Sequence, residues 1–198
     1  SAYMSRAIIN LGLKRYEEVE SDLTQAIKLS PQSGFYINRA IAREELYNLR
    51  GAMEDLDMAV MLDPDNALAR MNRGLLREKV GDYNRAIEDY SFVLECVPDH
   101  IRARYARAML LSRTGDWQGA VDDLTWILRE YPDFIGGYKI RAGLYRNMGL
   151  NAQATADEMK AMDLEMLSFV GVDGNDQPSQ EEINKREQRK KVDDLNNY

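Results

Sequence analysis

Apolar residues along this chain recur at helical spacing, in segments separated by short polar turns. The stretch Ala67–Pro98 shows the pattern most clearly, because two amphipathic segments meet at Gly81-Asp82 and the second stops before Pro98. Glycine permits a tight turn between helices, and proline disfavours a helix at the residue before it. The pattern therefore predicts a pair of helices folded back on each other.

The same unit recurs along most of the chain. Prolines spaced by 33, 34 and 34 residues are Pro31, Pro64, Pro98 and Pro132. Three series of small or aliphatic residues keep the same rhythm: Ala7, Ala40, Gly74, Ala108 and Ala142; Val19, Ala52, Ala86, Ala120 and Ala154; and Ala26, Ala59, Val93, Ile127 and Ala161. A period of this length indicates a solenoid in which each helix pair buries its apolar face on its neighbours.

The pattern predicts five helix pairs. The expected pairs are Ala2–Leu13 with Tyr16–Leu29, Gly34–Leu46 with Leu49–Leu62, one pair within 67–100, one within 101–134, and Ile135–Met148 with Asn151–Met166. The first junction is one residue shorter than the later ones, and we expect the deletion between Ser30 and Gly34.

The repeat resembles the tetratricopeptide repeat family over roughly residues 1–166. The unit 67–100 carries the family's positions as Gly74, Gly81-Asp82-Tyr83, Ala86, Tyr90, Val93 and Pro98, and the unit 101–134 carries them as Ala108, Gly115-Asp116-Trp117, Ala120, Leu124, Ile127 and Pro132. The aromatic residue often found early in the first helix is present as Tyr3, Tyr36 and Tyr138, whereas Arg70 and Arg104 replace it in the central repeats. The resemblance implies an all-α fold, a right-handed α-solenoid of about five helix hairpins.

We expect the array to occupy 1–166, with repeats at about 1–32, 33–66, 67–100, 101–134 and 135–166. Glu158 stands where the other copies carry an apolar residue, which indicates a solvent-facing last repeat. Residues 167–198 are predicted to form a loop followed by a charged helix or flexible tail, because Ser179 begins a capping box. The repeat pattern is already present at Tyr3, so we expect the chain to be a piece of a longer polypeptide, and further repeats upstream stay open.

Composition excludes several classes of function. The formal net charge of −7 argues against nucleic acid as a partner and against an anionic membrane surface. No apolar run approaches the ~20 residues that a membrane helix requires. The compartment is not readable from this sequence, which carries no N-terminal targeting segment.

The chain lacks a recognisable catalytic or metal-binding arrangement. His100 lies in a connector without a nucleophile at a useful spacing, and the single cysteine, Cys96, is expected to be a buried, inert thiol. Asp173–Asp176 faintly resembles a calcium loop, but Pro178 stands where such a loop needs glycine. We therefore expect no enzyme activity, no metal and no cofactor.

Every repeat carries an arginine and, sixteen residues later, an aspartate. The pairs are Arg6 and Asp22, Arg39 and Asp55, Arg73 and Asp89, Arg107 and Asp123, and Arg141 and Asp157. A ladder of charges could grip a ligand. We favour a structural ion pair between the two helices of each hairpin, because the arginine adjoins the small residue at the helix seam.

The family resemblance implies that the first helices line a concave groove. The candidate groove residues are Met4, Ile8, Ile37, Asn38, Ile41, Met71, Asn72, Leu75, Tyr105, Met109, Arg113, Lys139 and Arg146. This groove is apolar at its N-terminal end and basic toward Lys139 and Arg146. Only Asn38 agrees with the carboxylate clamp by which some family members hold chaperone tails, so that class is excluded.

The favoured function is a non-catalytic scaffold that binds a peptide or protein segment of unknown identity in this groove. A structural spacer or self-association module of a larger polypeptide is the alternative, and formation of homo-oligomers stays open.

Overall fold

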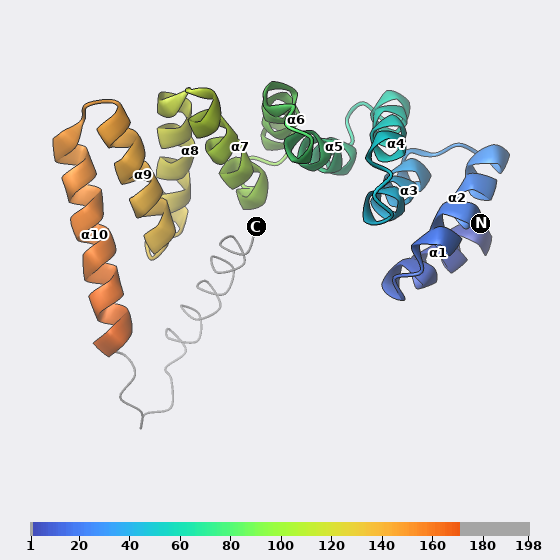
Figure 1. Ribbon diagram of the computed structural model, residues 1–198, viewed down its shortest axis with the longest axis horizontal. Helices are drawn as coiled ribbons and strands as arrows, with labels where there is room; N and C mark the ends of the chain where they lie inside the picture. The colour runs from blue at the N-terminus through green and yellow to red at the C-terminus, as the bar shows by residue number, and fades with distance from the viewer. Residues whose placement is uncertain (1, 171–198) are drawn as a thin grey trace. The chain divides into compact units, whose positions relative to one another are not determined.

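A computed structural model describes residues 2–170 of the chain, and within this range every regular element is an α-helix. The helices are α1 (Ala2–Gly12), α2 (Tyr16–Leu29), α3 (Ser33–Glu45), α4 (Leu49–Leu62), α5 (Ala67–Lys79), α6 (Tyr83–Cys96), α7 (Ile101–Thr114), α8 (Trp117–Glu130), α9 (Ile135–Asn147) and α10 (Asn151–Val170). Consecutive helices pair into hairpins (Figure 1). The chain divides into two compact units, Ser1–Asp99 (unit 1) and His100–Tyr198 (unit 2), each of which is described by itself.

Most second helices end where the sequence places a proline. The helices α2, α4, α6 and α8 each stop two residues before a proline, as expected from the restriction that proline places on the preceding residue. The connector between α2 and α3 is Ser30–Gln32, whereas Asp63–Asn66 joins α4 to α5. The shorter repeat therefore loses its residue in that connector, as predicted.

The last helix differs from the expectation. It continues to Val170, four residues past the predicted end at Met166. The residues 167–170 lack a proline, and glycine first appears at Gly171, so nothing in the sequence breaks the helix earlier. The helix predicted after Ser179 and the calcium-like stretch at Asp173 lie outside the described residues.

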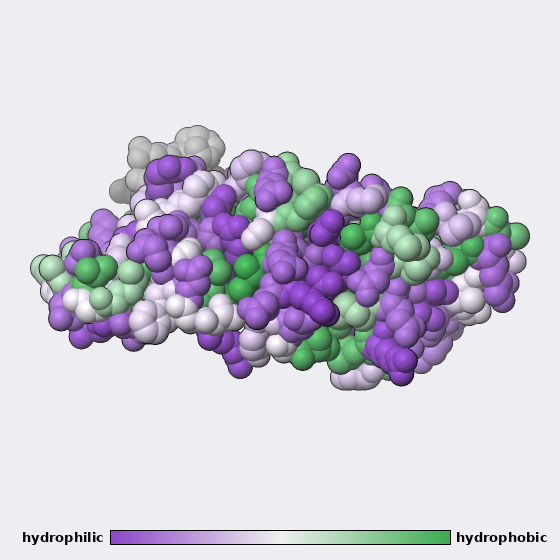
Figure 2. Space-filling view, turned by 90° about the horizontal axis from the view of Figure 1, so that it is seen from above, coloured by the Kyte–Doolittle hydropathy of each residue, from purple (hydrophilic) through white to green (hydrophobic). Residues whose placement is uncertain are grey.

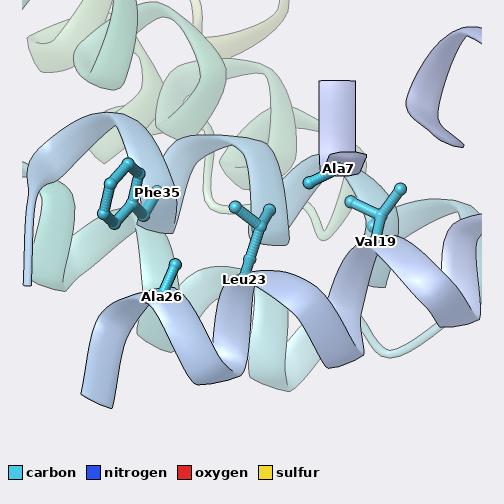
Figure 3. Packing of buried hydrophobic residues seen from close by; sticks show 6 residues of the cluster. Ala7, Val19, Leu23, Ala26 and Phe35 are labelled. Carbon is cyan, nitrogen blue, oxygen red and sulfur yellow. The ribbon is translucent and has the colours of Figure 1, made fainter. Parts of the chain in front are cut away.

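Within each unit, the second helices α2, α4 and α8 pack on both their own first helix and the following one. In the N-terminal core, Val19, Leu23 and Ala26 of α2 cluster with Ala7 of α1 and Phe35 of α3 (Figure 3). All are buried. This shared burial is what makes neighbouring hairpins depend on each other for their stability.

Polar side chains cap several helices. Asn48, Asn66 and Asp116 accept hydrogen bonds from backbone N–H groups in the first turns of α4, α5 and α8. The imidazole Nδ1 of His100 likewise accepts from the Ala103 N–H at 3.1 Å. The single histidine therefore has a structural position at the start of α7.

Candidate functional site

All five arginine–aspartate pairs form between the two helices of a hairpin. The Nε and Nη2 atoms of Arg73 donate to the two carboxylate oxygens of Asp89 at 3.0 and 2.8 Å. The same two-bond arrangement joins Arg6 to Asp22, Arg39 to Asp55, Arg107 to Asp123, and Arg141 to Asp157. The five aspartates are buried. A planar guanidinium matches a carboxylate in this way, so the pair can be buried without unsatisfied oxygens.

Three of these arginines also hold the preceding hairpin. The remaining Nη1 atom donates to Thr24 from Arg39 at 3.0 Å, to Asp57 from Arg73 at 2.9 Å, and to Thr125 from Arg141 at 2.9 Å. One side chain thus ties three helices together. Helical spacing within one hairpin did not predict these acceptors, although Thr24, Asp57 and Thr125 keep the repeat spacing and are all polar.

The electrostatics of the pairs match a structural role. The hydrogen bond to Asp55 raises the pKa of Arg39, and the bond to Asp157 raises the pKa of Arg141, although burial of each guanidinium acts in the opposite direction. The hydrogen bond from Arg6 lowers the pKa of Asp22. These carboxylates are committed to contacts inside the hairpins and offer little to a ligand.

In the two central repeats, Arg70 and Arg104 occupy the position at which the other repeats carry a tyrosine. The guanidinium of Arg70 stacks 4.2 Å from the centre of the Phe92 ring, and that of Arg104 lies 4.2 Å from the Trp126 ring. In the other repeats the aromatic ring is on the first helix, as with Tyr36, whose ring lies 5.6 Å from Arg39. Both arrangements place an arginine on an aromatic ring beside the buried carboxylate.

The candidate groove residues of unit 1 fall into two groups. The exposed or half-buried ones lie on one face of α1, α3 and α5, which we call the unit 1 face: Ile8, Asn38, Ile41, Leu68, Asn72 and Leu75. Ile8 is 55% exposed, and Leu68, which the sequence analysis did not include, is 61% exposed. The spacing of Leu68 to Asn72, one helical turn, could have identified it. The helices α3 and α5 contact each other and are tied by Lys79 and Glu44 at 2.8 Å, so their parts of this face adjoin.

Other groove candidates of unit 1 are occupied by packing. Ile37 is 3% exposed and Met71 is 6% exposed, so the two side chains point into the fold. Met4 is half-buried and packs on the N-terminal core, and the half-buried Ile41 of the unit 1 face also packs in part on the core that contains Ile37 and Val60. Helical spacing placed these residues on the same stripe as Ile41 and Leu75, but it does not distinguish a groove from the seam between neighbouring first helices.

Two asparagines on the unit 1 face have defined orientations. The amide nitrogen of Asn38 donates to the Gly34 carbonyl at 2.7 Å, and that of Asn72 donates to the Leu68 carbonyl at 2.8 Å. Each amide is thereby held against its own helix. The unit 1 face therefore combines aliphatic side chains with two oriented amides, a chemistry that suits an extended or helical peptide.

In unit 2 the predicted basic residues are largely matched by acidic ones. The Nζ atom of Lys139 donates to Glu165 at 2.5 Å, and Arg146 donates to both carboxylate oxygens of Glu158 at 2.7 Å. Glu158, which breaks the apolar pattern in the sequence, is thus explained by an ion pair. Arg113 is exposed, Met109 is half-buried, and burial raises the pKa of the half-buried Tyr105.

Among residues 2–170, no cluster of three or more His, Cys, Asp or Glu side chains could hold a metal ion. The thiol of Cys96 is exposed, contrary to the expectation of burial. Its position at the end of α6 corresponds to Leu62 of α4 and Leu29 of α2, which are also exposed because the last turn extends past the core.

The comparisons with known proteins agree with this architecture. A sequence model described as tetratricopeptide repeat matches residues 1–33. This model covers the first hairpin, and the repeating helix hairpins of the described residues agree with the architecture of that family. No curated protein sequence matches it.

Solved structures of MamA share the tetratricopeptide fold of this chain. A crystal structure of MamA protein superposes with a TM-score of 0.77 at 17% identity, covering 89% of this chain and 97% of that one. MamA of MSR-1 gives 0.72 at 23% identity, covering 84% and 96%. Residues 41 to the end of MamA from Desulfovibrio magneticus RS-1 give 0.72 at 17% identity, covering 83% and 94%. At these identities the likeness establishes the tetratricopeptide fold and nothing about ligands.

Among the described residues, no helix is long and apolar enough to cross a membrane. The surface seen in Figure 2 is largely hydrophilic, with hydrophobic residues gathered in separate patches. The unit 1 face, with its exposed Ile8 and Leu68, is the candidate site.

Proposed function

We propose that this chain is a non-catalytic scaffold that binds a peptide or protein segment on its first helices. The observation that carries the proposal is the unit 1 face, where Ile8 and Leu68 are more than half exposed beside the half-buried Ile41 and Leu75. Aliphatic side chains next to oriented amides can accept apolar anchors and hydrogen-bond polar groups of a ligand.

The proposed ligand presents apolar anchors rather than acidic ones. Lys139 and Arg146 were the sequence-based candidates for binding acidic residues, but both form ion pairs with carboxylates of α10. A ligand carboxylate would have to displace Glu165 or Glu158. Apolar anchors on the unit 1 face meet no such competition.

The test is affinity capture with the wild-type chain and an Ile8→Glu, Leu68→Glu variant as baits. Both side chains are exposed, so the substitutions should leave the fold intact, which circular dichroism will check. We expect a protein that the wild type retains and the variant loses, followed by binding of its purified segment to the wild type.

A matched control carries Leu29→Glu, since Leu29 is 73% exposed but lies at the end of α2, a second helix. This variant should retain the ligand. Equal capture by all three baits, or none by any, would contradict binding at the unit 1 face.

The alternative function, a spacer or self-association module, has a specific observation in its favour. Met159, Met162 and Met166 are each more than half exposed and follow one stripe of α10. Methionine is an adaptable apolar side chain, and such a stripe could pack against another helix. Sedimentation equilibrium will decide: self-association that Met162→Asp abolishes would favour the alternative over a monomeric peptide-binding scaffold.

A further inference from the structure

The outer side of α1 carries residues that the preceding hairpin buries in other repeats. Ile9 is 62% exposed, whereas Ala42, Leu76 and Leu144, at the matching position of α3, α5 and α9, are at most 3% exposed. Leu76 is covered by Ala52 and Leu56 of α4, and Leu144 by Val121 and Leu124 of α8. Figure 3 shows the equivalent junction, with Leu23 of α2 between α2 and α3.

Arg6, on the same side of α1, is also more exposed than the matching arginines of the other repeats. The side chains of Arg39, Arg73 and Arg141 are 11%, 11% and 14% exposed, and each donates its Nη1 to the preceding hairpin. The side chain of Arg6 is 64% exposed and binds Asp22 of its own hairpin through Nε and Nη2. Arg6 and Ile9 are thus the polar and the apolar residue that, in the internal repeats, contact the preceding hairpin.

We infer that α1 is a docking surface for the second helix of a further tetratricopeptide-type hairpin. The internal junctions define the chemistry of the occupant. Its helix carries a hydroxyl or carboxylate acceptor facing Arg6, as Thr24, Asp57 and Thr125 face the arginines that follow them. A leucine immediately before the acceptor, as Leu23, Leu56 and Leu124 are in these helices, covers Ile9.

A second copy of this chain does not offer this chemistry through its last helix. In α10 the acceptor position holds Met159, and the leucine position holds Glu158, which is paired with Arg146. Stacking α10 on α1 would place a carboxylate on Ile9 and a thioether on Arg6. The occupant is therefore a different hairpin, and this inference does not depend on the peptide-binding function proposed above.

The experiment adds residues 33–67 ahead of Ser1, so that Ser1 follows Ala67 as Leu68 does in the chain itself. The added hairpin brings Leu56 and Asp57 to the proposed face. We expect amide hydrogen exchange in α1 to slow by about tenfold or more and the melting temperature to rise, because the first helix gains a covered face.

The matched control is the same fusion with Arg6→Ala and Ile9→Asp, in which α1 should exchange as fast as in the unmodified chain. Unchanged exchange in α1 of the first fusion would overturn the inference.

A second measurement separates the occupants. Sedimentation equilibrium compares the unmodified chain with Ile9→Asp, a change at an exposed side chain. We expect both to behave alike. A self-associated species that Ile9→Asp abolishes would place a second copy on α1 and overturn the assignment of a different hairpin.

Discussion

Gly74 and Tyr90 are matched in size at the seam of the third hairpin. A Cβ atom on Gly74 would lie 2.7 Å from the Cε1 atom of Tyr90, whose ring is fully buried and whose hydroxyl donates to Glu78 at 2.7 Å. The second and fourth hairpins carry alanine opposite leucine at the same two positions. The small residue and its partner therefore vary together, because their summed volume has to fill one space.

This match predicts coupled effects of substitution. Gly74→Ala should destabilise the fold by about 1–3 kcal/mol, since overpacking moves a buried ring. Adding Tyr90→Leu should recover a large part of that loss by recreating the alanine–leucine pairing. Urea unfolding of the wild type, both single variants and the double variant provides the coupling energy, and strictly additive effects would contradict this account.

In the turns of the first two hairpins, a residue other than glycine adopts the left-handed backbone conformation. Lys14 and Tyr47 have φ angles of 56° and 59°, at the position where later hairpins have Gly81 and Gly115 at 86° and 91°. A side chain in this region is strained by its Cβ.

We therefore predict that Tyr47→Gly stabilises the fold by about 0.5–1 kcal/mol, as the relief of strain exceeds the entropy that glycine adds to the unfolded chain. Tyr47 is 86% exposed, so little packing is lost. Thermal unfolding checks the sign, and Gly81→Ala serves as the opposite control and should lower the melting temperature.

At the scale of the helix, the bidentate arginines should matter more than the stacked ones. Arg73 makes two bonds to Asp89 and one to Asp57, while Arg70 stacks on Phe92 and its Nη1 lies 3.6 Å from Asp89. Arg73→Ala should cost roughly 1–3 kcal/mol, because it leaves a buried carboxylate with fewer donors. Arg70→Ala should cost less, and equal melting temperatures for the two variants would refute this ranking.

The pairing of α1 with α2 should depend on pH through Asp22. The hydrogen bond from Arg6 holds the pKa of Asp22 below its ordinary value, so the folded state keeps the carboxylate ionised to lower pH than the unfolded chain does. The pair therefore stabilises the fold above about pH 4 and loses this contribution as the pH falls further.

Asp22→Asn should lower the melting temperature at neutral pH, and its difference from the wild type should shrink toward pH 3. A difference that is constant between pH 7 and pH 3 would argue against this pairing.

At the scale of the molecule, stability should vary along the array. Each internal first helix of unit 1 is covered on both sides, as the buried Ala42 and Leu76 show, while Ile9 leaves α1 uncovered on one side. Amide hydrogen exchange in the unmodified chain should therefore be faster in α1 than in α3 and α5. Exchange that is uniform through unit 1 would indicate a single cooperative block instead.

The candidate site was less predictable than the helices that carry it. Ile37 and Met71 share a helical stripe with Ile41 and Leu75, yet the first pair is buried and the second is half-buried. The sequence predicted a groove that is basic near Lys139 and Arg146, but these side chains form ion pairs with Glu165 and Glu158. Periodicity assigns a residue to a side of its helix. It does not reveal which neighbouring helix covers that side, or which charge from that helix meets it.

The sequence by itself determined the repeat, the helix pairs, the ends of the helices that precede a proline and the partners within a hairpin, because these depend on short-range spacing, on proline and on residues sixteen apart. Only the tertiary structure decided what happens between hairpins. The Nη1 bonds of Arg39, Arg73 and Arg141, the burial of Met71 and the exposure of Ile9 all depend on how one hairpin stacks on the next. Stacking is a property of surfaces brought together in space, and a linear pattern records only that each helix has an apolar side.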